Sequence, residues 1–96
     1  MDNRVWLNNL YDYYKDLLTE KQQLYFEDYY FDNLSLTEIA ENNNVSRNAV
    51  HKQLKETLEK LENYEDKLKL YDKKQKINKI LDKVDKRIKE EIMNLI

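Results

Sequence analysis

Two short runs of apolar residues at helical spacing, each following a serine, lie within residues 35–55. Ser35 and Glu38 have the S-x-x-E spacing of a capping box, in which each side chain accepts a hydrogen bond from the other residue's backbone N–H. The spacing therefore predicts a short helix that ends at about Asn42. Its apolar positions share one face: Leu36, Ile39 and Ala40.

Three consecutive asparagines, residues 42–44, follow this first helix. Asparagine tolerates the left-handed conformation that a tight turn between helices requires, so the run predicts the turn. Val45 is an apolar residue that fits between the two helices, and Ser46 is a favourable N-cap for a second helix that begins at Arg47. Two helices joined by such a turn form a helix-turn-helix, whose second helix enters the major groove in DNA-binding proteins.

The second helix has two distinct faces when its residues are placed about 100° apart. An arc roughly 80° wide is expected to be buried and holds Val50, Leu54, Thr57, Leu61, Tyr64 and Leu68. A second arc, about 140° wide and free of acids, is expected to face solvent and holds Arg47, Asn48, His51, Lys52 and Lys55. Farther along the exposed side come Glu59, Glu62 and Asp66, so only the start of the helix is expected to meet a polyanion.

Two further helices are predicted before the helix-turn-helix. Asp2 or Asn3 can cap the first, whose helical stripe consists of Leu7, Leu10, Tyr11, Tyr14, Leu17 and Leu18. Thr19 and Gln22 repeat the capping-box spacing and start a helix to about Phe31. This helix is apolar or aromatic almost all round, which predicts a central position. Glu27, Asp28 and Asp32 lie among its aromatic residues, which favours core packing over base stacking, since acids repel phosphates.

A third stripe of apolar residues extends through the end of the chain. The second helix of the helix-turn-helix is expected to continue to about Leu70, with a bend or a continuation at residues 71–74. The stripe then holds Ile77, Leu81, Val84, Ile88, Ile92 and Leu95. A helix with such a stripe must cover it, either by folding back onto its own bundle or by packing against a second chain. We expect these six residues to form a dimer or partner interface, and we favour a homodimer.

The composition favours an all-α protein. The chain contains no Gly and no Pro, which the turns of all-β folds require. The expected architecture is a small helical bundle with a helix-turn-helix over residues 1–70 and a basic amphipathic helical extension over residues 71–96. The formal net charge is −2, with more acidic than basic residues in 1–45 and twice as many basic as acidic residues in 73–96. This asymmetry can steer an anionic partner to the tail or pair two chains head to tail.

Several classes of function are disfavoured by what the sequence lacks. Without cysteine there is no disulfide and no Cys-ligated metal, and one histidine without neighbouring ligands makes a metal site improbable. No cofactor motif and no converging catalytic group is visible, so we expect no enzyme activity. No apolar run approaches the ~18 residues of a membrane span. We expect a cytoplasmic protein without membrane insertion.

The segment 17–68 resembles the YlxM family of small bacterial helix-turn-helix proteins, which are similar in turn to region 4 of sigma factors. The resemblance rests on LTEKQ at 18–22, YY at 29–30, LSLTEIAE at 34–41 and VSRNAV at 45–50, with LYDYY at 10–14 upstream. Genes of that family lie beside those for the signal recognition particle GTPase Ffh and its receptor FtsY. The resemblance therefore implies a regulatory role in that pathway, in which the chain binds Ffh or its RNA.

Two functional hypotheses follow. The first is a regulatory adaptor of the signal recognition particle, and the second is a sequence-specific DNA-binding transcriptional regulator. In either case the nucleic-acid-binding residues are expected on the second helix of the helix-turn-helix: Ser46 as the cap, Arg47 to guanine or phosphate, Asn48 to adenine, His51 as a possible base contact, and Lys52 and Lys55 to phosphates. An ordinary exposed histidine is the alternative for His51. The modest net charge favours the adaptor, whereas the fold favours DNA.

Overall fold

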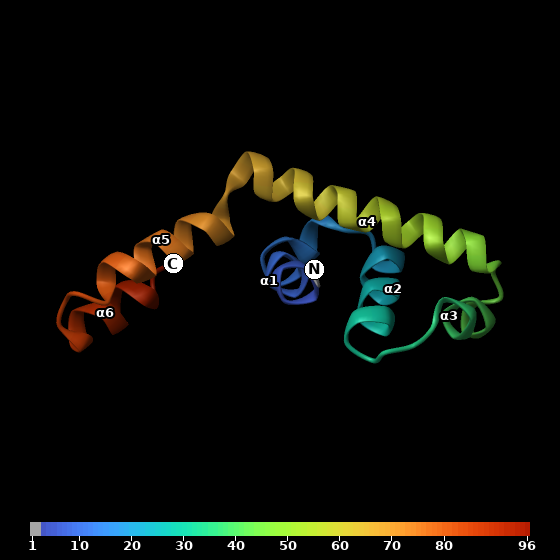
Figure 1. Ribbon diagram of the computed structural model, residues 1–96, viewed down its shortest axis with the longest axis horizontal. Helices are drawn as coiled ribbons and strands as arrows, with labels where there is room; N and C mark the ends of the chain where they lie inside the picture. The colour runs from blue at the N-terminus through green and yellow to red at the C-terminus, as the bar shows by residue number, and fades with distance from the viewer. Residues whose placement is uncertain (1–2) are drawn as a thin grey trace.

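The computed structural model describes residues 3–96, whose regular structure consists of six α-helices and one 3-10 turn. In chain order these are α1 (Arg4–Tyr14), the 3-10 turn η1 (Lys15–Leu17), α2 (Glu20–Tyr30), α3 (Leu36–Asn43), α4 (Arg47–Leu68), α5 (Leu70–Leu81) and α6 (Lys86–Met93). The expected all-α fold is confirmed. In Figure 1 the long helix α4 lies across α1, α2 and α3, while α5 and α6 extend to one side.

The helix starts follow the predicted caps. Both capping boxes are formed: the Thr19 hydroxyl accepts from the Gln22 N–H at 3.2 Å, and the Ser35 hydroxyl accepts from the Glu38 N–H at 3.0 Å. These hydrogen bonds satisfy backbone donors that have no partner within the helix. Asn3 occupies the N-cap of α1 without a side-chain hydrogen bond. The alternative cap, Asp2, lies outside the described residues.

Two clusters of buried side chains form the core, and α2 and α4 contribute to both. The first cluster joins α1, α2 and α4 through Leu10, Phe26 and Leu61. The second joins α2, α3 and α4 through Tyr25, Ile39, Ala40, Val50 and Leu54. The central position predicted for α2 is therefore observed, and two of its aromatic residues, Tyr25 and Phe26, pack as core.

Some apolar residues of the predicted faces remain partly exposed. Leu17 is 51% exposed because it lies in the tighter 3-10 turn, where the spacing of an α-helix no longer holds. Leu24 and Phe31 of the α2 segment are 47% and 45% exposed, so this segment is not covered on all sides. Leu68 was expected on the buried arc of α4 but is 45% exposed, because it lies in the last turn of α4, beyond the side chains that pack on α1.

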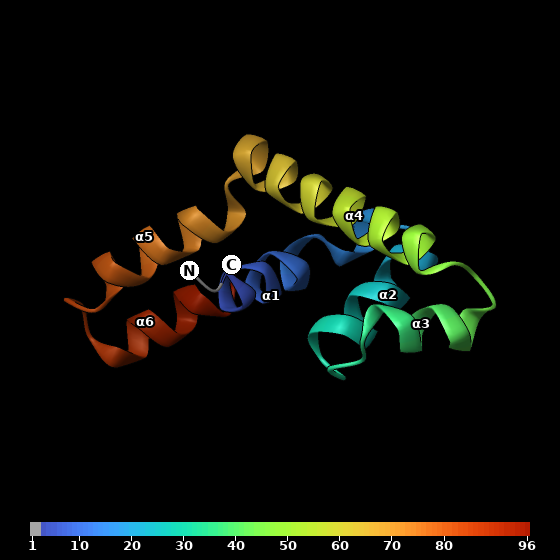
Figure 2. The same cartoon turned by 45° about the vertical axis from the view of Figure 1, so that its right-hand side comes forward.

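The C-terminal segment differs from the single extension that the sequence predicts. Lys69 adopts a left-handed conformation with φ 56° and separates α4 from α5, so the break precedes the expected bend at residues 71–74. A second break follows α5. There the Asp85 side chain accepts from the Arg87 N–H at 2.8 Å and starts α6. The two helices lie side by side as an antiparallel hairpin in both Figure 1 and Figure 2, and Lys89 and Asp82 form an ion pair between them.

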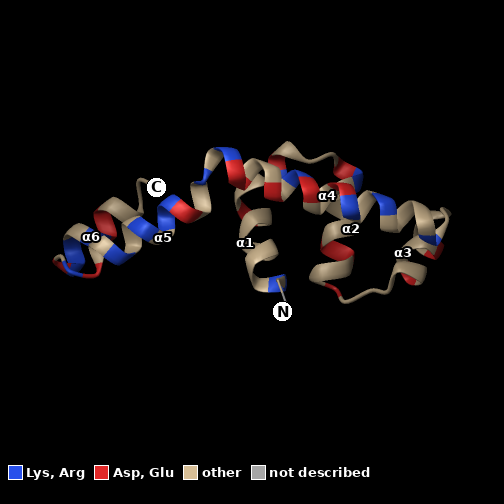
Figure 3. Ribbon diagram, turned by 45° about the horizontal axis from the view of Figure 1, so that its top comes forward, with Lys and Arg blue, Asp and Glu red and all other residues tan. Residues whose placement is uncertain are grey.

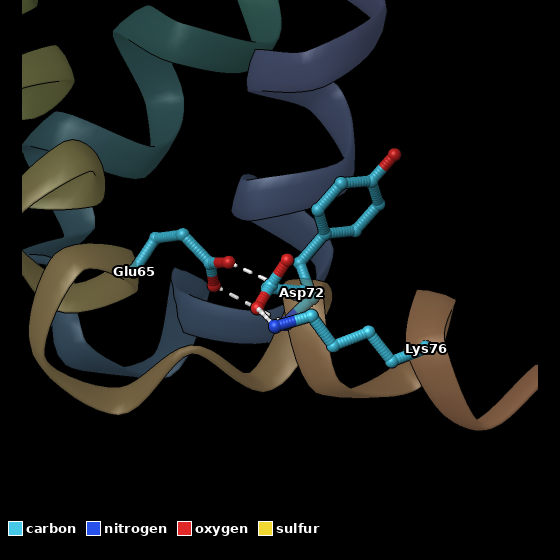
Figure 4. A network of polar contacts seen from close by, with 4 residues as sticks. Glu65, Asp72 and Lys76 are labelled. Atoms are coloured by element: carbon cyan, nitrogen blue, oxygen red, sulfur yellow. Dashed lines mark hydrogen bonds and ion pairs between the residues drawn. The ribbon is translucent and has the colours of Figure 1, made fainter.

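A buried carboxylate holds the corner between α4 and α5 (Figure 4). Glu65, only 9% exposed, accepts hydrogen bonds from the Tyr71 N–H at 3.1 Å and the Asp72 N–H at 3.0 Å. It also accepts one from the Tyr14 hydroxyl of α1 at 2.6 Å. A carboxylate at this place satisfies the free N–H groups of the α5 start and complements its helix dipole. Glu65 therefore ties α5 to the bundle.

Candidate nucleic-acid interface

The helix-turn-helix is formed by α3, the turn at residues 44–46 and the first turns of α4. Asn44 is the residue that takes the left-handed conformation, with φ 53°, and its N–H bonds back to α3. Val45 is half-buried against Ile39, Ala40 and the facing side chains of α4. This packing fixes the direction in which α4 leaves the turn. The predicted two-helix corner and its inward apolar side are both observed.

The Ser46 hydroxyl accepts a hydrogen bond from the Ala49 N–H at 3.0 Å, so Ser46 is the N-cap of α4. The Ala49 and Val50 N–H groups also bond to the Ser46 carbonyl. The N–H groups of Arg47 and Asn48 have no partner within the helix, as is usual at a helix start. Such free donors, together with the positive end of the helix dipole, form a site that attracts phosphate.

A solvent-facing surface covers the first three turns of α4 and matches the predicted arc. We call it the basic face of α4; all of its members are exposed, and they are Arg47, Asn48, His51, Lys52 and Lys55. Among residues 3–96, none of their side chains forms a hydrogen bond or an ion pair. The side chains are therefore available to an external ligand, while Val50 and Leu54 on the opposite side anchor the helix.

Acidic residues limit this surface along the helix. Glu56 is half-buried and is the first acid after the basic face, and Glu59, Glu62 and Asp66 are exposed farther along. In Figure 3 the α3 end of α4 has blue segments without red ones, and farther along the helix red segments appear with blue ones between them. An open cleft near the end of α4 is lined by several of these carboxylates and by Trp6. The start of α4 therefore carries cationic side chains without carboxylates, whereas carboxylates outnumber cationic side chains farther along the helix.

A comparison of the sequence with known protein families agrees with the helix-turn-helix geometry. The sequence matches the family UPF0122, described as "Putative helix-turn-helix protein, YlxM / p13 like", over residues 1–95. The chain belongs to the UPF0122 family. It is 46% identical over 101 residues to a UPF0122 protein of Halalkalibacterium halodurans, covering 100% of this chain and 93% of the relative. The identity is 43% over 100 residues to one of Oceanobacillus iheyensis, covering 99% and 95%.

A UPF0122 protein of Fusobacterium nucleatum is 48% identical over 81 residues, which cover 84% of this chain and 79% of the relative. The predicted resemblance to YlxM is thus confirmed. None of the helices in residues 3–96 combines the length and the apolar character that a membrane-crossing helix needs.

In this UPF0122 chain, the six residues predicted as a dimer or partner interface do not share one helix. Ile77 and Leu81 lie in α5, Ile88 and Ile92 lie in α6, and Val84 and Leu95 lie in the turns that follow these helices. Leu81 is buried, and Ile77 and Ile92 are half-buried. The other three are exposed, namely Val84, Ile88 and Leu95. The hairpin therefore uses part of the stripe internally and leaves the remainder open to solvent.

Glu65 is the important residue that the sequence pattern did not single out. It lies one turn after Leu61 on the buried side of α4. A lone acid among the apolar positions of a helix was the available signal, because a buried carboxylate needs hydrogen-bond partners. Its partners come from α1 and from the start of α5, so the α4 pattern alone could not identify them.

Proposed function

We propose that this UPF0122 chain is a non-catalytic regulatory protein that binds nucleic acid through the basic face of α4. The observation that carries the proposal is that Arg47, Lys52 and Lys55 are exposed and unpaired in the part of α4 that begins with free N–H groups. Side chains on a helix fixed by core packing are better positioned than side chains on a loop. Cationic side chains and helix N-termini are the groups that bind phosphates.

We propose further that the protein acts in the cytoplasm in the signal recognition particle pathway and contacts Ffh or its RNA. The support is the YlxM resemblance together with the charge distribution. The formal net charge of −2 and the carboxylates that follow the basic face disfavour a long contact with a duplex. A folded RNA or a protein surface requires only a short contact with the start of α4.

A sequence-specific DNA-binding regulator is the second candidate, and the placement of Asn48 beside Arg47 favours it. Both side chains are exposed in the first turn of the second helix of the helix-turn-helix. That turn contacts base edges in DNA-binding members of this fold class. Asparagine can pair with adenine and arginine with guanine in the major groove.

A pull-down with a triple variant and a matched control tests the first candidate. The variant Arg47→Ala, Lys52→Ala, Lys55→Ala removes three charges from the basic face. The control Lys21→Ala, Lys67→Ala, Lys79→Ala removes the same charge from exposed residues elsewhere. We expect the wild type and the control to retain Ffh and its RNA, and the basic-face variant to lose them. Equal retention by all three proteins would overturn the assignment.

Fluorescence anisotropy with two probes separates the candidates. One probe is signal recognition particle RNA, and the other is a random-sequence DNA duplex, both measured at the same salt concentration. The first candidate predicts tighter binding to the RNA, with the DNA bound weakly. Preference for the duplex would favour the second candidate, and a binding site could then be selected from a DNA library.

A further inference from the structure

The C-terminal hairpin leaves a set of apolar side chains uncovered. The molecule is elongated, 53 × 27 × 25 Å, and the hairpin forms one end of it (Figure 1, Figure 2). Four of its aliphatic residues are strongly exposed: Ile80 at 66%, Val84 at 41%, Ile88 at 51% and Leu95 at 83%. A helix as short as α6, with eight residues, is not stable alone in water. Its apolar side chains therefore need more cover than α5 provides.

Two of these exposed residues, Ile80 of α5 and Ile88 of α6, lie on one surface of the hairpin. The half-buried residues of α6, Lys89, Ile92 and Met93, mark the side that faces α5. The inner side of α5 is marked by the buried Leu81 and the half-buried Ile77. At about 100° per residue, Ile88 is rotated from the inner side of α6 in the same sense as Ile80 is rotated from the inner side of α5. In an antiparallel pair, equal senses of rotation place side chains on the same face. We call this surface the open face of the hairpin.

An apolar groove extends the open face toward the bundle. Its walls are Tyr13 of α1, Leu70 and Ile77 of α5, and the C-terminal Ile96, together with Lys73 and Lys74. Leu70 and Ile96 are 42% and 49% exposed. With this groove the uncovered aliphatic surface amounts to roughly 400 Å² per chain. Exposed apolar patches of this size commonly mark interaction sites.

We infer that the open face binds a second copy of this chain, so that two hairpins pack as a four-helix bundle with their α6 helices antiparallel. Helical hairpins with one uncovered apolar face can form such bundles. A standard interface buries about 800 Å² per partner, and homodimer interfaces are roughly two-thirds apolar in their cores. The open face and the groove together supply about half of that area as apolar surface, and the lysine stems around them can supply more.

The charges beside the apolar stripe also fit a second copy. Arg87 and Glu91 are four residues apart and lie on the same flank of Ile88 and Ile92. In an antiparallel pair related by a two-fold axis, equal flanks meet, so Arg87 of each chain faces Glu91 of the other. The pattern is therefore complementary to itself. This inference does not rest on the proposed binding of nucleic acid.

Light scattering coupled to size-exclusion chromatography tests the inference on the full chain. We expect the wild type to have twice the chain mass of 11.8 kDa. Ile88→Glu is expected to have the mass of one chain. Val5→Glu is the matched control, because Val5 is an apolar residue that is 75% exposed on α1, and this variant should stay dimeric. A wild-type mass of one chain, or an Ile88→Glu variant that remains a dimer, would overturn the inference.

A charge-exchange experiment keeps the test valid even if Ile88→Glu unfolds. Arg87→Glu and Glu91→Arg each place like charges opposite one another in the proposed dimer, and each is expected to raise the dimer dissociation constant about tenfold. Mixing the two variants restores both opposite-charge pairs in a heterodimer. Each chain keeps its own like-charged pair, so effects within α6 cannot explain a recovery. We expect the mixture to regain the dimer mass; a mixture that stays monomeric would refute the arrangement.

Discussion

Replacing Glu65 by alanine tests how α5 is attached to the bundle. The Glu65 carboxylate accepts hydrogen bonds from the Tyr14 hydroxyl and from the N–H groups of Tyr71 and Asp72. The Tyr14 side chain is only 1% exposed, and its hydroxyl oxygen accepts from the Leu70 N–H at 3.1 Å. The substitution removes the acceptor for three donors that come from two other helices.

The loss of stability caused by Glu65→Ala depends on which of the three donors water can reach once the carboxylate is gone. Tyr71 and Asp72 are half-buried, so water can partly replace the carboxylate at their N–H groups, whereas the Tyr14 hydroxyl is enclosed. An unsatisfied buried donor costs about 1–3 kcal/mol, and hydrogen bonds to a charged group contribute about 1.5–3 kcal/mol each. We therefore expect Glu65→Ala to lower the free energy of unfolding by about 3 kcal/mol. Typical domains of this length have roughly 5–14 kcal/mol in total.

Urea unfolding followed by circular dichroism measures this loss at one fixed protein concentration. Glu62→Ala is the matched control, because Glu62 is exposed on the same helix; it should change the free energy of unfolding by less than about 0.5 kcal/mol. Glu65→Gln keeps one acceptor oxygen and should lose about 1–2 kcal/mol. If Glu65→Ala unfolds at the same urea concentration as Glu62→Ala, the carboxylate does not hold the corner.

Three further predictions concern single side chains. Ser46→Ala should lower the free energy of unfolding by about 1 kcal/mol, measured by urea titration, because the α4 N-cap is lost. Asn44→Ala should lower the free energy of unfolding by about 1 kcal/mol in the same assay, because Asn44 has a positive φ that alanine disfavours. Asn44→Gly should not lower it, and equal losses for the two variants would contradict this explanation. Burial and the Glu65 hydrogen bond raise the pKa of Tyr14 to about 12. Since this pKa exceeds the ~10 of an unfolded tyrosine, stability should be intact below pH ~10 and fall as the pH rises toward 12. Tyr14→Phe should reduce the loss of stability between pH ~10 and 12. If the free energy of unfolding of this variant depends on pH as that of the wild type does, the raised pKa of Tyr14 is wrong.

Local features were predictable from the sequence because their determinants are a few residues apart. The hydrogen bonds of Ser35 and Thr19 reach only three residues along the chain. The outward direction of Arg47 and Lys52 follows from helical spacing once Val50 is known to face inward. The helix-turn-helix and the exposure of its basic face were therefore predicted, whereas binding by that face stays a prediction.

Features set by distant parts of the chain were not predictable in the same way. The main side-chain partner of Glu65 is Tyr14, 51 residues away, so no local pattern shows the α4–α5 corner. The stripe from Ile77 to Leu95 has the spacing of a single helix. The structure interrupts it at the turn before Asp85, because the Asp85 cap and the Asp82–Lys89 ion pair favour a hairpin. A helical spacing alone does not specify whether the helix is continuous.

The salt dependence of nucleic-acid binding tests the central claim most directly. The association constant of the wild type and of the Arg47→Ala, Lys52→Ala, Lys55→Ala variant is measured by anisotropy between about 50 and 200 mM salt. Three phosphate contacts predict a slope of log K against log salt of roughly −2 to −3 for the wild type, and a slope near zero with much weaker binding for the variant. A wild type that binds neither RNA nor DNA at the lowest salt, or a variant with an unchanged slope, would contradict the account.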